Sequence, residues 1–314
     1  MLSAAALAAL LVLGCGAGDG TPGTKTRASA RAPRAPALCG RLRARITGRV
    51  SAPAATELSG LVLSRSQPGV LWTHNDSGDR PRVLAVAADG RLLGDVALTG
   101  AENVDWEDVA IGRGRVSGAG ATTTGGVLLV GDIGDNLARR TSIAVYRVAE
   151  PRVGVAGATT TAPASRIALR YPDGPRDAEA LLVDPTDGAL VIVAKSYSGR
   201  AGVYVADRPS TGATPATLRR SGRLSLGVRE AVTAGDVSAD GRTIVLRTYD
   251  RAFVWVRRDG ERVGAALRRR PCAAQAGLLV EGQGEALALT AAGDAFYTVP
   301  EGSRPAIRRY APAE

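Results

Sequence analysis

RLRARITGRV, residues 41–50, alternates arginine with apolar residues as a β-strand does, but no partner strand adjoins it in the sequence. Further along, five stretches share one pattern, in which an acidic or polar start leads into a short apolar strand and then a turn: 57–62, 105–110, 177–182, 233–238 and 283–288. The fifth copy ends before its fourth strand. We therefore expect residues 41–50 to supply that strand and to close a ring.

Each copy opens a unit of four strands. The second strands are VLWTHN, VLLVGD, ALVIVAKS, TIVLRTY and AFYTVP, and the third are RVLAVA, SIAVYRVA, AGVYVAD, AFVWVRR and AIRRYAP. The fourth are LLGDVALT, RIALRYP, TLRRSGRLSL and RVGAALRRR. Radial four-stranded units closed by the first strand of the chain define an all-β fold, the β-propeller. A β-sandwich would also contain many short strands, but it would not need a terminal strand to complete the last unit.

The number of copies predicts five blades. The longest spacing, between the second and third copies, contains two inserts, residues 113–126 and 152–164. Six blades is the alternative, if an insert conceals a degenerate unit. The propeller domain is expected to span residues 39–314.

The start of the chain resembles a bacterial lipoprotein signal. Residues 1–14 are apolar but too short to span a bilayer, and the small residues before Cys15 fit a lipobox with Cys15 as the lipidated residue. No basic residue precedes the apolar run, so the true start could lie upstream, and a plain secretory signal is the alternative. Residues 15–38, rich in Gly, Pro, Ala and Arg, read as a flexible tether. We expect a secreted protein anchored to the outer face of the bacterial cytoplasmic membrane.

Two further cysteines remain. In an oxidising compartment Cys39 and Cys272 are a candidate disulfide, and two unpaired buried thiols are the alternative. Cys39 precedes the closing strand and Cys272 enters the final blade, so a bridge would fasten the ring across nearly the whole chain.

The charge balance argues against nucleic acid as a partner. The net charge is +10, almost all from arginine, but the arginines are scattered and no nucleic-acid-binding motif is present. We expect a monomer that contacts a membrane only through its lipid and that binds a small molecule or a protein at the mouth of the channel.

Acidic residues gather where the inner strands begin. The polar run Asn75-Asp76-Ser77-Gly78-Asp79 has a counterpart in Asp132-Ile133-Gly134-Asp135-Asn136. Oxygen ligands of this kind suit calcium, and the predicted metal-site residues are Asp76, Asp79, Asp105, Glu107, Asp108, Asp132, Asp177, Glu179 and Glu285. The alternative is that these acids cap turns and accept hydrogen bonds from backbone amides.

Two cations and one histidine complete the candidates. Lys195 and Arg247 occupy the matching place at the end of the second strand in the third and fourth units and could bind an anion. A serine hydrolase triad would have to use His74, and no Gly-x-Ser-x-Gly elbow is present, so we disfavour that chemistry.

The motifs Asp177-Ala178-Glu179-Ala180-Leu181, Gln283-Gly284-Glu285-Ala286-Leu287, Asp105-Trp106-Glu107-Asp108 and Gly131-Asp132-Ile133-Gly134-Asp135-Asn136 resemble those of secreted bacterial propellers related to alkaline phytase and the esterase-like phytase domain. The resemblance extends over residues 40–314 as a pattern and implies calcium in the channel that binds substrate phosphate. Thr233, Gly235 and Ser59 depart from the acidic pattern.

Two functions follow from these observations. The preferred one is a lipid-anchored, non-catalytic propeller that binds a ligand or partner at an acidic channel mouth, with calcium, because the acidic set is incomplete and no nucleophile–base pair can be assembled. The alternative is a calcium-dependent phosphoesterase or an esterase-like hydrolase. Fold alone does not decide between them.

Overall fold

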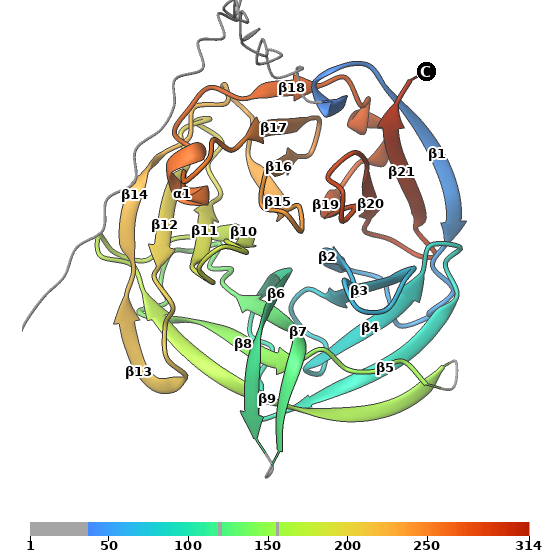
Figure 1. Cartoon of the computed structure of the whole chain (residues 1–314), viewed down its shortest axis with the longest axis vertical. Coiled ribbons are helices and arrows are strands. Elements are labelled where there is room, and N and C mark those ends of the chain that lie inside the picture. Colours follow the sequence, from blue (N-terminus) through green and yellow to red (C-terminus); the bar gives the residue numbers. More distant parts are fainter. Residues whose placement is uncertain (1–36, 119–120, 155–156, 314) are drawn as a thin grey trace, which may run out of the picture. The chain divides into compact units, whose positions relative to one another are not determined.

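The computed structural model describes residues 37–118, 121–154 and 157–313, with no side-chain description at 115–124. The predicted signal peptide, Cys15 and nearly all of the tether lie outside the described residues. The unit Ala35–Glu314 is a β-propeller whose described strands form five four-stranded blades around an axis (Figure 1). The predicted fold class and the prediction of five blades are confirmed. No helix among the described residues is long and apolar enough to cross a membrane.

The blades follow the order of the chain. Blade 1 contains β2–β5, blade 2 β6–β9, blade 3 β10–β12 with β14, blade 4 β15–β18, and blade 5 β19–β21 with β1. The strands are β1 Leu42–Arg49, β2 Leu58–Leu63, β3 Val70–Asn75, β4 Arg82–Ala87, β5 Leu92–Thr99, β6 Trp106–Gly118, β7 Ala121–Asp132, β8 Ile143–Ala149, β9 Ala158–Arg170, β10 Ala178–Val183, β11 Leu190–Ala194, β12 Gly202–Ala206, β13 Gly212–Thr217, β14 Arg219–Arg223, β15 Val232–Val237, β16 Thr243–Thr248, β17 Ala252–Val256, β18 Cys272–Ala274, β19 Gly284–Leu289, β20 Phe296–Pro300 and β21 Ala306–Pro312. Short helices are η1 Ala37–Cys39, α1 Val263–Ala266 and η2 Leu278–Glu281.

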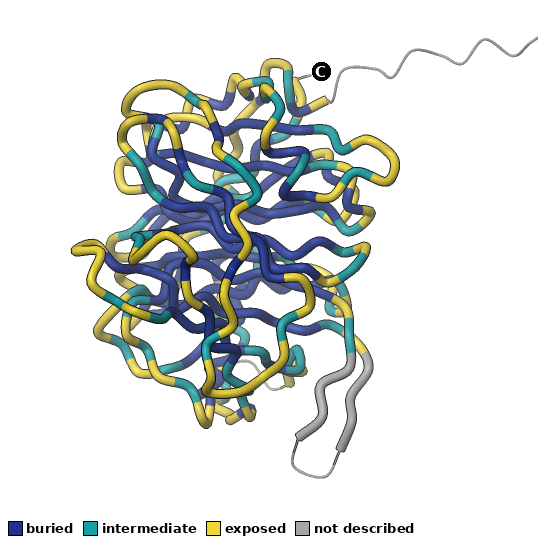
Figure 2. Tube along the Cα trace, turned by 90° about the vertical axis from the view of Figure 1, so that its left-hand side faces the viewer, coloured by how far each residue is buried: buried dark blue, intermediate teal, exposed yellow. Residues whose placement is uncertain are grey.

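Apolar cores lie between neighbouring blades. Trp72 of blade 1 packs with Trp106 and Tyr146 of blade 2 in one of them, and the other interfaces have equivalent cores. The inner strands β10, β15 and β19 are buried at every position because a blade covers each face. Figure 2 shows these buried strands in the middle of the unit and exposed turns toward its edges.

The N-terminal strand closes the ring. β1 pairs antiparallel with β21, from Leu42 opposite Pro312 to Arg49 opposite Ala306, and completes blade 5 as expected. The predicted disulfide between Cys39 and Cys272 is also confirmed, with a Cα–Cα distance of 5.6 Å. Its position differs from the prediction in one respect, since Cys272 begins β18, the outer strand of blade 4. The bridge therefore joins the closing segment to blade 4.

Neither insert forms a sixth blade within the described residues. In the first insert, residues 113–118 and 121–126 lengthen the β6–β7 hairpin. The first half of β9, Ala158–Pro163, pairs in parallel with β5, and its second half is the outer strand of blade 2. β13 then adds in parallel to β9. The second insert thus connects blades 1 and 2 by their outer strands, and β13 connects blade 3 to blade 2.

One predicted strand is wrong. RVGAALRRR was expected to be the fourth strand of unit four, but its Val263–Ala266 segment is the helix α1, and the outer strand is β18. Val263, Ala266 and Leu267 are buried, because a three- and four-residue spacing directs them to one side of a helical turn. The apolar run Val263–Leu267 is so short that its pattern fits both the period of two residues of a strand and the 3.6-residue period of a helix.

Candidate metal site at one rim of the propeller

Two chain positions converge at one rim of each blade. An inner strand begins where the second strand ends, as in the pairings of Trp106 with Asp132 and Ala178 with Ala194. Residues just before the inner strands and just after the second strands therefore meet at this rim, here called the acidic rim. Antiparallel pairing brings Asp76, Asp105, Asp177 and Lys195 to this one rim from different blades.

A β-bulge turns one inner-strand residue out of the ladder in each of the five blades. The pairing register skips one residue near the start of β6, β10, β15 and β19, at Glu107, Glu179, Thr233 and Glu285. In blade 1 the skipped residue is Gly60, which has a positive φ of 67°. Bulges re-aim side chains and are frequent beside binding sites. Three of the five positions thus carry a carboxylate at the same level of the channel.

The carboxylates of blades 1, 2 and 3 meet. Ligand oxygens of Asp76, Asp105 and Glu107 lie within 4.8 Å of one another, and so do those of Glu107, Asp177 and Glu179. Glu107 belongs to both groups. These five residues, here called the acidic cluster, could hold a metal ion through oxygen ligands.

Burial and mutual repulsion raise the pKa values of three members of the acidic cluster, Glu107, Asp76 and Glu179. Burial, with Glu179 and Asp76 as neighbours, raises the pKa of Glu107 to about 11. Burial, with Asp105 and Glu285 nearby, raises the pKa of Asp76 to about 6. Burial raises the pKa of Glu179 to about 8 despite the opposing charge of Lys195. A cation would relieve this repulsion and displace the protons.

Lys195 and Tyr249 border the cluster. The Lys195 ammonium forms an ion pair with Glu179 Oε1, and this carboxylate outweighs the effect of burial to raise the pKa of Lys195. The ammonium also lies 5.6 Å from the centre of the Tyr249 ring, whose hydroxyl donates to Glu285 Oε1 at 3.0 Å. Glu179 Oε2 is buried and has no hydrogen-bond partner among the described residues. Buried carboxylate oxygens normally have a partner, and a bound cation would be a partner for Glu179 Oε2.

Other predicted metal ligands already have protein partners. Asp79 accepts hydrogen bonds from Asn75 Nδ2 and Arg82 Nε, both at 2.8 Å. Asp132 pairs with Arg140 at 2.9 Å and accepts the amide of Asp105 at 3.0 Å. These contacts shape the rim loops and correspond to the turn-capping alternative.

Asp108, another predicted metal ligand, and Asp135, a rim residue that was not predicted as a ligand, also accept hydrogen bonds from the protein. Asp135 accepts the amides of Arg139 and Arg140, both at 2.8 Å. Asp108 accepts the amides of Val109 at 2.8 Å and, across the blade interface, Leu181 at 2.9 Å. Asp108 Oδ1 thus accepts an amide of its own strand, and Asp108 Oδ2 fastens blade 2 to blade 3.

Arg247 lies away from the acidic cluster. It is fully buried, and its Nη1 pairs with Glu281 Oε2 at 3.0 Å and donates to the carbonyl of Ala286 at 3.1 Å. These contacts join blades 4 and 5. Of the two predicted anion-binding cations, only Lys195 reaches the cluster.

His74 is part of the core. Its ring is fully buried, 5.5 Å edge-on from Trp106, and its Nδ1 lies 2.9 Å from the carbonyl of Asn75. Burial lowers the pKa of His74 to about 4, so it is neutral at ordinary pH.

Sequence reasoning missed Tyr249 and Glu301. Both follow a second strand directly, at the place that Asp76 and Lys195 hold in their own blades. Burial and the neighbouring Glu285 carboxylate raise the pKa of Glu301 to about 8. Applying the strand-end rule to all five units would have found them.

The fold and site define a five-bladed β-propeller with an acidic site at one rim. No protein-family model matches the sequence, and no curated protein matches it. Similar solved structures include the PQQ-bound aldose sugar dehydrogenase from Streptomyces coelicolor, 13% identical over 86% of this chain and 98% of that one, TM-score 0.46. XC5397, a gluconolactonase from Xanthomonas campestris, is 11% identical over 86% and 89%, TM-score 0.45. At these values the likeness concerns the fold and says nothing of this chain's activity.

Proposed function

We propose that this protein is a non-catalytic binding propeller of the cell envelope, in which the acidic cluster holds calcium and the calcium helps to capture an anionic ligand or partner at the channel mouth. The observation that supports this best is the meeting of five carboxylates from three blades, with Glu107 in both groups.

Calcium suits the cluster better than other metals. Calcium takes six to eight oxygen ligands in flexible geometry. Asp76, Asp105 and Asp177 are partly exposed, so water and an anionic ligand can complete the coordination. Zinc prefers nitrogen and sulfur ligands, whereas the single histidine lies in the core and Cys39 and Cys272 form a disulfide.

Thermal unfolding with calcium, magnesium or chelator tests the metal. A ligand at about one hundred times its Kd stabilises the folded state by about 2.7 kcal/mol, so calcium is expected to raise Tm by several degrees. Glu179→Gln removes a ligand charge and should abolish the increase, as should Glu285→Gln if Glu285 completes the site. Asp259→Asn is the matched control, because Asp259 is an exposed turn residue whose one ion pair, to Arg242, is long at 3.7 Å.

A calcium shift of the same size in Glu179→Gln would remove that residue from the site. No shift in the unaltered protein would refute the calcium proposal.

A calcium-dependent phosphoesterase or esterase-like hydrolase is the second candidate. The observation in its favour is the sharing of Glu107 by two ligand groups, since a bridging carboxylate between two cations is a common way to bind and activate a phosphoryl group. The resemblance to phytase-related propellers points the same way. Calcium-dependent hydrolysis of p-nitrophenyl phosphate or p-nitrophenyl acetate, lost in Glu107→Gln, would favour this candidate over the binding function.

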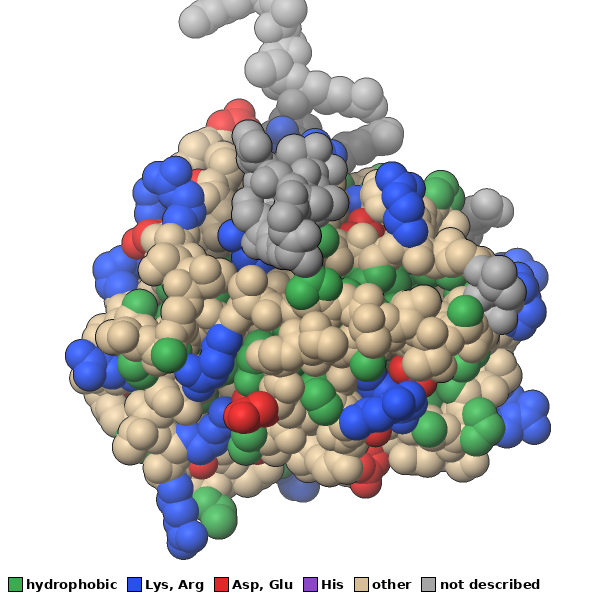
Figure 3. Space-filling model, turned by 90° about the horizontal axis from the view of Figure 1, so that it is seen from below, with side chains coloured by type: hydrophobic (Ala, Val, Ile, Leu, Met, Phe, Trp, Pro, Cys, Tyr) green, Lys and Arg blue, Asp and Glu red, His purple; other side chains and the backbone are tan. Residues whose placement is uncertain are grey.

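We also propose a location. The lipobox before Cys15 supports a lipid anchor on the outer face of the cytoplasmic membrane, and no nucleic acid is expected as a partner. On the face shown in Figure 3 the Lys and Arg side chains lie in separate groups, not in one continuous basic patch.

A further inference from the structure

A cavity separate from the acidic cluster lies between blades 2 and 3, at the opposite rim of the propeller. It has a volume of about 300 Å³, at the lower end of the range for small-molecule sites. The Asp187–Gly188 turn, which lines it, joins the far ends of β10 and β11. The cavity therefore shares no residue with the acidic cluster.

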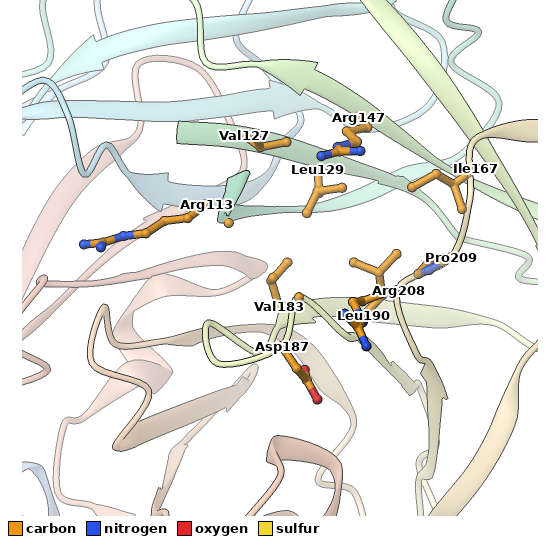
Figure 4. Close-up of a pocket in the computed structure, with 12 residues that line it drawn as sticks. Arg113, Val127, Leu129, Arg147, Ile167, Val183, Asp187, Leu190, Arg208 and Pro209 are labelled. Atoms are coloured by element: carbon orange, nitrogen blue, oxygen red, sulfur yellow. The ribbon is translucent and has the colours of Figure 1, made fainter. Parts of the chain in front are cut away.

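The walls of this cavity are apolar. Apolar side chains from two strands of blade 2, β7 and β9, and from the inner two strands of blade 3 face it in Figure 4: Val127, Leu129, Ile167, Val183 and Leu190. Each of these five is buried in the fold, so the hydrophobic surface exists without any rearrangement.

A glycine creates the space. Gly112 stands five residues after the bulged Glu107. The same offset leads to Asp184, Ser238 and Thr290 in the later blades, whose side chains cap the turn that ends the inner strand. In blade 2 the strand instead continues into the long hairpin. A Cβ at Gly112 would lie 3.2 Å from Val183 Cγ1 and 3.8 Å from Leu129 Cδ1, so a larger side chain there would fill the cavity.

Arginines line the cavity beside the apolar walls. Arg113, Arg147 and Arg208 contribute to the lining, against one carboxylate, Asp187. Asp187 Oδ1 is already used by the amide of Ala189 at 3.0 Å. Neither Arg113 nor Arg208 forms a side-chain ion pair with any of the described residues.

We propose that this cavity binds a small amphiphilic carboxylate, of the size and chemistry of a medium-chain fatty acid. The acyl chain would cover the apolar walls, and the carboxylate would meet Arg208, which lies beside Leu190 in Figure 4, since guanidinium groups bind carboxylates through paired hydrogen bonds. The guanidinium of Arg208, which has no ion pair with any of the described residues, favours an anion over a neutral or cationic amphiphile. The apolar walls disfavour inorganic phosphate.

Titration calorimetry with octanoate, on the full-length protein and below the concentration at which octanoate forms micelles, tests the proposal. We expect one saturable site, with octanol and inorganic phosphate at least about tenfold weaker, the ratio that corresponds to one charge-assisted hydrogen bond. Gly112→Val should abolish binding. Gly125→Val is the matched control, because it adds the same side chain to the same hairpin where no atom lies within 4 Å.

Arg208→Asn keeps the test decisive if Gly112→Val does not fold. Arg208 is exposed and has a φ of 47°, a conformation that asparagine tolerates. Its octanoate affinity should fall about tenfold with an unchanged Tm.

Absence of octanoate binding, equal binding of octanol, or unaltered binding in a folded Gly112→Val or Arg208→Asn protein would each overturn the proposal. Glu179→Gln and chelator should leave octanoate binding unchanged, so this result and that of the calcium proposal are independent.

Discussion

Removal of the disulfide should cost the propeller a large part of its stability. Cys39 and Cys272 are separated by 233 positions in the sequence, and in the chain-entropy model a loop of that length restricts the unfolded chain by about 5 kcal/mol. The unfolding entropy is about 2.1 cal/mol/K per residue, summed over about 275 folded residues. Dividing the lost free energy of unfolding by this entropy gives a decrease in Tm of about 9 °C. The change tested is the double variant Cys39→Ser, Cys272→Ser.

Differential scanning calorimetry of the double variant, beside the unaltered protein with and without reductant, measures the effect. Reduced unaltered protein should melt with the double variant, because both lack the same covalent link. A decrease below about 2 °C would refute the reasoning, since it would mean that the pairing of β1 with β21 alone keeps the ends together and that the loop constraint contributes little.

Three further outcomes are expected. Acids whose pKa is raised by folding bind more protons in the folded state than in the unfolded state. In the absence of calcium, the free energy of unfolding should therefore fall from pH 5 to pH 8, as Asp76 and then Glu179 lose their protons, and Glu107→Gln should weaken this fall. Urea unfolding at several pH values measures the change. Asp108→Ala leaves two buried amides without an acceptor and should cost about 3 kcal/mol by the same assay, whereas a cost below about 1 kcal/mol would contradict the fastening role. Cys15→Ala should move the protein from the membrane to the soluble fraction after cell fractionation, and persistence in the membrane would contradict lipidation.

The closed ring could be predicted from the sequence because it follows from the number of strands in each repeat. The sequence shows four complete units, a fifth unit that lacks its outer strand, and one unpaired strand at residues 41–50. The ring closes only if this strand completes the fifth unit, and β1 does pair with β21. The parallel additions of β9 to β5 and of β13 to β9 could not be predicted in this way. They depend on how the edges of neighbouring blades approach in space, for which no local pattern exists.

The candidate site was predictable as a region but not residue by residue. Acidic positions at the strand starts identified Glu107, Asp177 and Glu179 as neighbours of one axis. The sequence could not separate these from Asp79 or Asp132, because the distinction lies in which amide or guanidinium faces each carboxylate after folding. The bulge that re-aims Glu107 also leaves no residue signature of its own.

The pairing of the first strand with the last has a consequence for biosynthesis. At 5–20 residues per second, about 10–50 s pass between synthesis of β1 and of its partner β21, and during that time β1 is an unpaired edge open to other chains. Arg43, Arg45 and Arg49 alternate along it, and charges on a waiting edge discourage such encounters. We therefore expect the arginines of β1 to discourage its pairing with other chains until β21 has been made.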